Sequence, residues 1–175
     1  MPFTPYHFGF GFFLGIIFFP FIDFTVVMIA SVVLDLEPLT IIILDLPLPL
    51  HGFFHTYLGA TIISLLLTVC IWPLRRYLSR IASILRLHQQ SSFRHILPAS
   101  LIGTYSHVFL DSILYAEMNP LYPLLGNPFL NLVWSISIYD FCVVFGLLGF
   151  VLYIVRFYRS LSSPTEKETQ TSPFD

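Results

Sequence analysis

Charged residues are scarce in this chain. Of its 175 residues, 10% are charged, 56% are hydrophobic and 17% are aromatic. A soluble domain carries roughly 25% charged residues, and the eight basic and ten acidic side chains here could not cover a globule of this length. The composition therefore excludes an ordinary soluble protein. It indicates an integral-membrane protein that is surrounded by lipid and has no nucleic acid partner.

Cysteine is also scarce, and the N-terminus carries no sign of a cleaved leader. Cys70 and Cys142 lie far apart inside apolar runs, so we interpret both as packing residues rather than as a disulfide or a metal pair. The N-terminus lacks the basic region and the small-residue cleavage site of a secretory signal, so the apolar run after it should stay in the mature protein. We expect one integral-membrane helical domain over residues 1–160 and a disordered polar tail over residues 161–175.

Long apolar runs occupy most of the chain. They cover roughly residues 8–22, 24–44, 57–73, 96–116 and 130–155. About 20 apolar residues in a helix cross the ~30 Å hydrocarbon core of a bilayer. Pro20 and Asp23 separate the first two runs, which predicts a turn and a helical hairpin that enters the membrane. The expected fold is all-α: a polytopic bundle of about five membrane-embedded helices plus one amphipathic surface helix.

The amphipathic helix is predicted from the segment PLRRYLSRIASILRL, which starts at Pro73. Arginines and serines lie on one helical face, and the opposite face carries Leu74, Leu78, Ile81 and Leu85. This pattern is typical of a helix that lies on a membrane surface. The alternative is that the segment extends the preceding helix.

Basic residues are absent from residues 1–74. All eight fall in two later segments, with Arg75, Arg76, Arg80, Arg86 and Arg94 in one and Arg156, Arg159 and Lys167 in the other. The positive-inside rule predicts that both segments are cytoplasmic, which requires an even number of crossings between them. We therefore expect a cytoplasmic C-terminus.

Histidines and carboxylates are the exceptions within the apolar runs. If the N-terminus lies outside, the predicted crossings bring one set to the outer end of the bundle: His7, Asp35, Glu37, His51, His55, His107 and Asp111. A polar group in hydrocarbon costs several kcal/mol unless it is paired or ligated. Each residue taken alone could bond a backbone carbonyl or cap a helix. The convergence of the whole set indicates a site.

The spacing of these residues suits metal ligands. Residues four apart share a helix face, so His51 with His55, and His107 with Asp111, can each direct two ligands at one point. Imidazole and carboxylate suit zinc or, less selectively, manganese, iron or nickel. One tetrahedral ion takes four ligands, and the sequence offers more candidates than that. The candidate ligands are His7, Asp35, His51, His55, His107 and Asp111. We expect either two metals bridged by a carboxylate or water, or one metal with an acid/base pair.

Two further acids are left open by the sequence. Asp140 is a lone acid in the last apolar run, and it could form an interhelical hydrogen bond or orient a histidine. Glu117 follows Asp111 by six residues, and it could face the site or belong to an ordinary loop.

Four motifs in order resemble those of a known family. FTPYHF, SVVLDLEP, HGFFHT and GTYSHVFLDS, spread over roughly residues 2–130, are similar to motifs of the membrane-bound metal-dependent hydrolases often called YdjM-like. The resemblance implies a metal site formed by His7, Asp35, His51 or His55, His107 and Asp111. More distantly, the order of histidines and aspartates resembles that of the all-helical zinc-dependent phospholipases C. That likeness implies phosphoester hydrolysis.

Two motifs depart from the family pattern. Where many members have HRGFTHS, this chain has HGFFHT, with its histidines four residues apart and no arginine after the first. The ligand position is therefore left between His51 and His55. Where many members have PDxDH, this chain has LDLEP, so Glu37 could stand in for a second aspartate.

These observations predict a metal-dependent hydrolase in a prokaryotic cell membrane, with its site toward the outer face. A divalent metal would bring the pKa of a bound water toward ~7. Asp35 or Glu37 would act as general base, and His51 or His55 would pass a proton to the leaving group. A site at that depth favours a lipid or lipid-linked phosphoester as substrate. The rival predictions are a small membrane transporter and a metal-stabilised, non-catalytic membrane scaffold.

Overall fold

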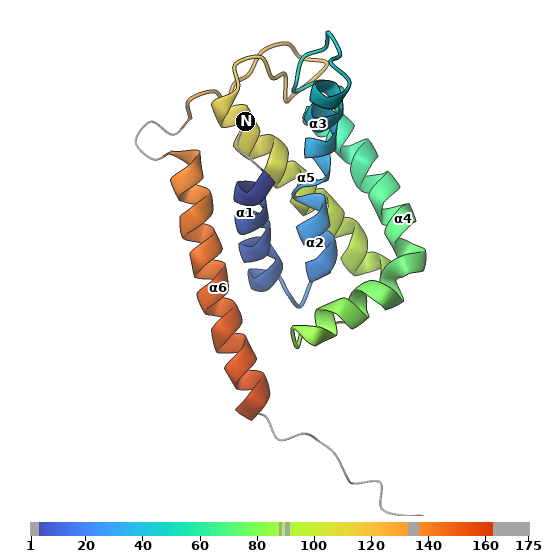
Figure 1. Cartoon of the computed structure of the whole chain (residues 1–175), viewed down its shortest axis with the longest axis vertical. Helices are drawn as coiled ribbons and strands as arrows, with labels where there is room; N and C mark the ends of the chain where they lie inside the picture. Colours follow the sequence, from blue (N-terminus) through green and yellow to red (C-terminus); the bar gives the residue numbers. More distant parts are fainter. Residues whose placement is uncertain (1–3, 88, 90–91, 133–136, 163–175) are drawn as a thin grey trace, which may run out of the picture.

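The fold is a bundle of helices (Figure 1). The computed structural model describes residues 4–87, 89, 92–132 and 137–162, and its elements are α1 (Thr4–Ile17), α2 (Phe24–Ala30), η1 (Val33–Asp35), α3 (Leu36–Ile43), η2 (Phe53–His55), α4 (Tyr57–Ile84), α5 (Phe93–Leu114) and α6 (Ile138–Ser162). α5 packs against α2 and α4, while α1 packs against α2 and α6. The described residues contain no strand, which confirms the all-α prediction.

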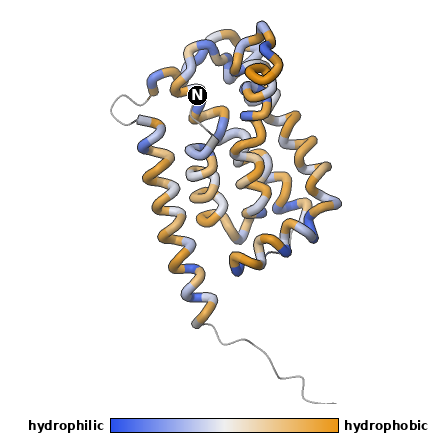
Figure 2. Tube along the Cα trace, viewed as in Figure 1, coloured by the Kyte–Doolittle hydropathy of each residue, from blue (hydrophilic) through white to orange (hydrophobic). Residues whose placement is uncertain are grey.

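Three stretches are long and apolar enough to cross a membrane. They are Phe24–Ile43, Tyr57–Ile84 and Ile138–Leu161, and α1 is a shorter apolar helix. Figure 2 shows hydrophobic residues along all the helices and dark blue, hydrophilic residues where α4 and α6 finish. These spans support membrane association. The count of five embedded helices stays a prediction.

The first two apolar runs form the predicted hairpin. α1 ends at Ile17, the chain turns through Pro20, and α2 begins at Phe24. Oδ1 of Asp23 accepts a hydrogen bond from the backbone N–H of Val26 at 3.1 Å, which satisfies one of the free amides at the start of α2. Pro20 and Asp23 therefore end one helix and start the next, as the sequence indicates.

The second apolar run is divided into short elements rather than forming one helix. α2 ends at Ala30, and the hydroxyl of Ser31 donates to the carbonyl oxygen of Met28 at 3.0 Å. Val32 then has φ −128°, which lies outside the helical range and separates α2 from η1. This break leaves Asp35 at the end of a short 3₁₀ turn, where its side chain reaches the interior of the bundle.

The segment predicted as a separate surface helix forms the second half of α4. The alternative prediction, that this segment extends the preceding helix, is therefore the one that the structure shows. α4 runs without interruption from Tyr57 to Ile84 and contains Pro73. Figure 1 shows that α4 bends along its length. Proline lacks a backbone N–H and its ring crowds the preceding turn, so it kinks a helix. Ala82 beyond the bend is buried in one cluster with residues of α1 and α2, which packs this half of α4 beneath the hairpin.

Small residues and hydroxyl groups hold the helices together. α1 and α6 approach so closely that a Cβ atom on Gly9 would lie 3.1 Å from the carbonyl oxygen of Cys142. Between α4 and α5, the buried hydroxyl oxygens of Ser64 and Thr104 lie 2.7 Å apart. Close backbone approach and interhelical hydrogen bonds are typical of membrane helix bundles.

The end of α6 overlaps the predicted tail. The helix continues to Ser162, so the prediction of a disordered tail is wrong for residues 161 and 162, which are helical. Arg159 lies in the last turn, where a positive charge is favoured by the helix dipole and helps the helix to continue. Residues 163–175 of the predicted tail lie outside the described residues.

Candidate metal centre

The residues predicted for the site come together at the end of the bundle where the loops gather. They lie on α1 (His7), η1 (Asp35), α3 (Glu37), the loop before η2 (His51), η2 (His55) and α5 (His107 and Asp111). The four histidines and Asp111 are buried, and the side chains of Asp35 and Glu37 are each 15% exposed. Six separate segments therefore contribute to one polar centre inside an apolar bundle.

Asp111 lies in the middle of this centre. Its Oδ1 is 3.1 Å from Nε2 of His7, and its Oδ2 is 3.2 Å from Nε2 of His107. The same Oδ2 is 3.8 Å from Nε2 of His55 and 3.9 Å from Nε2 of His51. One buried carboxylate therefore faces four imidazole rings, and each ring presents the same nitrogen to it.

Three of the four rings are held through their other nitrogen. The Nδ1 pairs are His55 with Oε2 of Glu37 at 2.7 Å, His51 with Oε1 of Glu117 at 2.9 Å, and His107 with the carbonyl oxygen of Ser31 at 2.8 Å. Histidines that bind metals typically donate their second N–H to a carboxylate or a backbone carbonyl. Such a bond fixes the tautomer and leaves Nε2 with a lone pair directed at the centre.

The ligand atoms fall into two neighbouring groups of three. Within each group the atoms lie within 4.8 Å of one another, and the groups are His7 with Asp35 and His107, and His51 with His55 and Asp111. The groups adjoin, because the rings of His7 and His107 stack with centroids 3.9 Å apart and both face Asp111. Either group could hold a metal ion, and Asp111 lies where it can contact both.

Several polar atoms of the centre have no hydrogen-bond partner among the described residues. All of them are buried. They are Nδ1 and Nε2 of His7, Nε2 of His55, Nε2 of His107, Oδ2 of Asp35 and Oδ1 of Asp111. An unsatisfied buried polar atom costs about 1–3 kcal/mol, so native proteins rarely leave several together. A network of protein hydrogen bonds does not account for these atoms. Divalent cations fit them, because neutral imidazole and carboxylate are ligands of such ions.

The contact between α5 and α2 positions His107. A Cβ atom on Gly103 would lie 2.5 Å from Cβ of Ala30 and 3.0 Å from the backbone nitrogen of Ser31, so only glycine permits this approach. His107 lies one turn further along α5, and its Nδ1 reaches the carbonyl oxygen of Ser31. The break after α2 leaves that carbonyl free of an intrahelical partner.

His51 and His55 converge for a different reason from the predicted one. The prediction placed both on one helix face, whereas His51 lies in a bend, His55 ends the 3₁₀ helix η2, and α4 begins only at Tyr57. The side chain of Thr56 accepts a hydrogen bond from the Gly59 amide and caps α4, which keeps both histidines outside that helix. His107 and Asp111 do share a face of α5, as predicted.

Glu37 and Glu117 contact histidines rather than the centre itself. Oε2 of Glu37 lies 2.7 Å from Nδ1 of His55, and its Oε1 accepts a hydrogen bond from the Phe54 amide at 3.5 Å. Glu117, whose side chain is 48% exposed, contacts Nδ1 of His51. Burial lowers the pKa of His55, against the opposing effect of the hydrogen bond to Glu37, which favours the neutral form that a metal requires. Asp140 lies exposed in the first turn of α6, away from the histidines.

Two partners of the centre were not identified from the sequence. The carbonyl oxygen of Ser31 is a backbone atom, so the residue type at this position does not indicate its role in the centre. The ring of Tyr115 stacks on His51 with centroids 4.0 Å apart. Tyr115 directly follows the end of α5, four residues after Asp111, and this short spacing was the available signal.

An apolar groove lies beside the centre. Its volume is about 410 Å³, and it runs between α3, the loop after it and α4. Glu37, the partner of His55, is the one charged residue in its lining, and the apolar side chains around it include Leu36, Leu48 and Phe54. A molecule in this groove would therefore meet the edge of the polar centre.

Comparisons with known proteins returned no relative. No family model matches the chain, and no curated protein and no solved structure matches it significantly.

Proposed function

We propose that this protein is an integral-membrane, metal-dependent hydrolase that acts on a lipid or lipid-linked phosphoester. The observation that carries the proposal is the position of Asp111, which faces Nε2 of four buried histidines while three of those rings are held at Nδ1 by other groups. In a purely structural network, each histidine N–H group would donate to an acceptor in the protein. Few buried polar atoms would then be left unpaired. Preorganised, unpaired lone pairs are what a cation site needs.

The proposed centre holds two divalent cations, with zinc as the best match to the donor set. His7, Asp35 and His107 would hold one ion, His51 and His55 would hold the other, and Asp111 is placed to contact both. Glu37 and Glu117 keep the rings of the second group in place through Nδ1. His55 was predicted both as a ligand and as a proton carrier, and the proposal keeps the ligand role, since Nδ1 faces Glu37 and Nε2 faces Asp111.

Chemical roles follow from which atoms are free. Divalent cations held there would lower the pKa of a bound water toward ~7 and would stabilise charge on a phosphoryl oxygen. Oδ1 of Asp35 lies 3.7 Å from His107, while its Oδ2 has no hydrogen-bond partner among the described residues, so this carboxylate can accept the proton of the attacking water. Glu37 was the other candidate base, and its bond to His55 suits it better to orienting that ring.

The groove supports an apolar substrate. It lies within the ~300–1,000 Å³ range of ligand pockets, and its lining exposes Leu36 and Leu48, each 58% exposed, beside the carboxylate of Glu37. An acyl or isoprenyl chain can occupy such a groove while its phosphoester reaches the polar centre. A small hydrophilic phosphoester would gain nothing from that lining.

The test is metal content together with hydrolysis of lipid phosphoesters by the purified protein. We expect about two zinc ions per chain, and release of phosphate or a phosphorylated headgroup from a lipid panel. His107→Ala and Asp111→Ala should lose metal and activity together. His95→Gln removes a histidine at the opposite end of α5 and serves as the matched control.

The two rival functions give different results in the same preparation. Bound metal whose removal unfolds the protein, with no hydrolysis of any lipid in the panel, would identify a metal-stabilised scaffold. Metal or proton flux into proteoliposomes without hydrolysis would identify a transporter. Absence of bound metal from a folded, monodisperse protein would refute the metal centre itself.

A further inference from the structure

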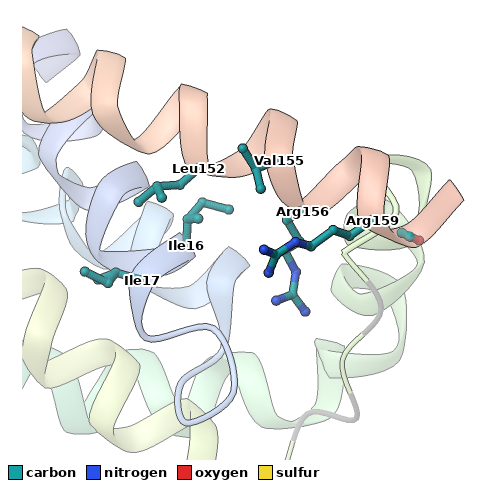
Figure 3. A pocket seen from close by; sticks show the side chains of 7 residues that line it. Ile16, Ile17, Leu152, Val155, Arg156 and Arg159 are labelled. Carbon is teal, nitrogen blue, oxygen red and sulfur yellow. The ribbon is translucent and has the colours of Figure 1, made fainter. Parts of the chain in front are cut away.

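A second pocket lies at the opposite end of the bundle from the metal centre. It has a volume of about 470 Å³ and lies between the C-terminal end of α1 and the last turns of α6. Ile16, Ile17, Leu152 and Val155 form its apolar wall, and Arg156 and Arg159 supply its charge. Figure 3 shows both arginine side chains extending from α6 toward the same space beside the apolar wall.

We propose that this pocket binds the phosphate headgroup of an anionic phospholipid, with one acyl chain against the apolar wall. The proposal is independent of the metal centre and of the reaction proposed there. It assigns a binding site at the basic end of the bundle.

Arg156 is held in place by an aromatic ring. Its guanidinium carbon lies 3.7 Å from the ring centroid of Phe19, which is itself buried at 4% exposure. Arginine stacks flat on aromatic faces, and stacking leaves the N–H groups at the edge of the guanidinium available. Among the described residues, Arg156 has no hydrogen bond to an acceptor and no carboxylate partner. Its donors are therefore preorganised and open to a ligand.

Arg159 adds a second guanidinium beside the first. It lies three residues further along α6, and residues three apart share a helix face. Both side chains line the same pocket. Guanidinium groups bind phosphate oxygens through paired N–H donors, so two of them on one side of a pocket match a phosphate better than they match a single carboxylate.

The apolar wall distinguishes a lipid from a free anion. Ile17 is 48% exposed and Val155 is 44% exposed, and both line the same pocket as the arginines. A phospholipid presents a phosphate and a hydrocarbon chain together, whereas an inorganic anion has no use for this wall. The helix dipole alone favours arginines at the end of α6, but it does not require a stacked guanidinium or an adjoining apolar pocket.

The position along the bundle agrees with this ligand. Arginines lie where α4 and α6 finish, among them Arg76, Arg80, Arg156 and Arg159, and the positive-inside rule assigns such an end to the cytoplasmic leaflet. That leaflet carries anionic lipids, and basic pockets between membrane helices on this side bind anionic headgroups. The pocket is therefore at the depth where phosphates of the inner leaflet lie.

The experiment is native mass spectrometry of the full chain in detergent, titrated with phosphatidylglycerol or phosphatidylcholine. We expect the wild type to retain phosphatidylglycerol roughly tenfold more strongly than phosphatidylcholine, and the double variant R156Q/R159Q to lose that preference. The double variant R76Q/R80Q removes the same charge from exposed positions of α4 and should behave as the wild type. Equal retention by wild type and R156Q/R159Q, or an equal loss in R76Q/R80Q, would overturn the proposal.

A second variant keeps the charges and fills the pocket. Val155→Trp should abolish phosphatidylglycerol retention although both arginines remain, and circular dichroism should show an unchanged helix content. An excess of inorganic phosphate should leave the bound lipid in place. If phosphate displaces the lipid from the wild type and Val155→Trp retains lipid normally, the pocket is a site for free anions and the lipid assignment is wrong.

Discussion

Nδ1 of His55 lies 2.7 Å from Oε2 of Glu37, and this carboxylate is also the one charged group in the lining of the neighbouring groove. The bond therefore connects the polar centre to the apolar groove. It directs Nε2 of His55 toward Asp111, 3.8 Å away. Glu37 therefore acts on the centre through a histidine rather than by direct contact.

Glu37→Gln should weaken metal binding without abolishing it. Removing a carboxylate that orients a metal-binding histidine typically lowers metal affinity about 10–100-fold. The measurement is zinc affinity by competition with a chelating dye. Asp140→Asn makes the same chemical change at an exposed position of α6 and should leave affinity unchanged. Complete loss of metal in Glu37→Gln would instead make Glu37 a direct ligand.

Gly52→Ala should have a similar but smaller effect, because it acts on the same carboxylate. A Cβ atom at position 52 would lie 2.5 Å from Oε1 of Glu37, so the carboxylate must shift relative to His55. We expect a loss of zinc affinity of up to about tenfold. In the double variant with Glu37→Gln the two losses should not add, since both act through one contact. Additive losses would show that Gly52 acts by another route.

Gly103→Ala should separate α5 from α2 and pull His107 away from the carbonyl oxygen of Ser31. The new methyl group would lie 2.5 Å from Cβ of Ala30, and overpacking of this kind costs about 1–3 kcal/mol of unfolding free energy. Metal affinity should fall along with stability. Adding Ala30→Gly removes the nearest clashing atom and should recover part of both losses, as measured by thermal unfolding and zinc binding. No recovery would mean that the contact at position 103 does not control the position of His107.

Removal of metal should lower thermal stability. The proposed ligands connect α1, η1, the segment around His51 and α5, so bound ions stabilise the folded chain by mass action. With metal at about 100 times its dissociation constant, chelation should lower the unfolding temperature by roughly 5–10 °C. Asp111→Asn should unfold at the same temperature with and without chelator. A chelator effect that persists in Asp111→Asn would place the metal elsewhere.

The residues that carry strong local signals were predictable from the sequence. Pro20 and Asp23 mark the hairpin turn because one cannot continue a helix and the other caps the next. His107 and Asp111 are four apart on a long apolar helix, so their common face follows from helical geometry alone. The meeting of sequence-distant histidines and acids follows from the positions of the runs.

The remaining features depend on contacts that the sequence does not reveal. His51 and His55 converge through a bend and a 3₁₀ turn, and neither shape follows from a four-residue spacing. The role of Ser31 comes from its backbone carbonyl, which is exposed only because α2 ends there. The continuity of α4 through Pro73 depends on packing of its second half beneath the hairpin, which outweighs the local preference for a break.

Anomalous X-ray scattering at the zinc edge shows whether Asp111 bridges two cations. We expect two anomalous peaks on either side of the Asp111 carboxylate, one within ~2.0–2.2 Å of ligand atoms of His7, Asp35 and His107, the other within the same distance of His51 and His55. Asp111→Ala should remove both peaks. A zinc-loaded crystal with no peak at Asp111, or with peaks only at other residues, would refute the bridged centre.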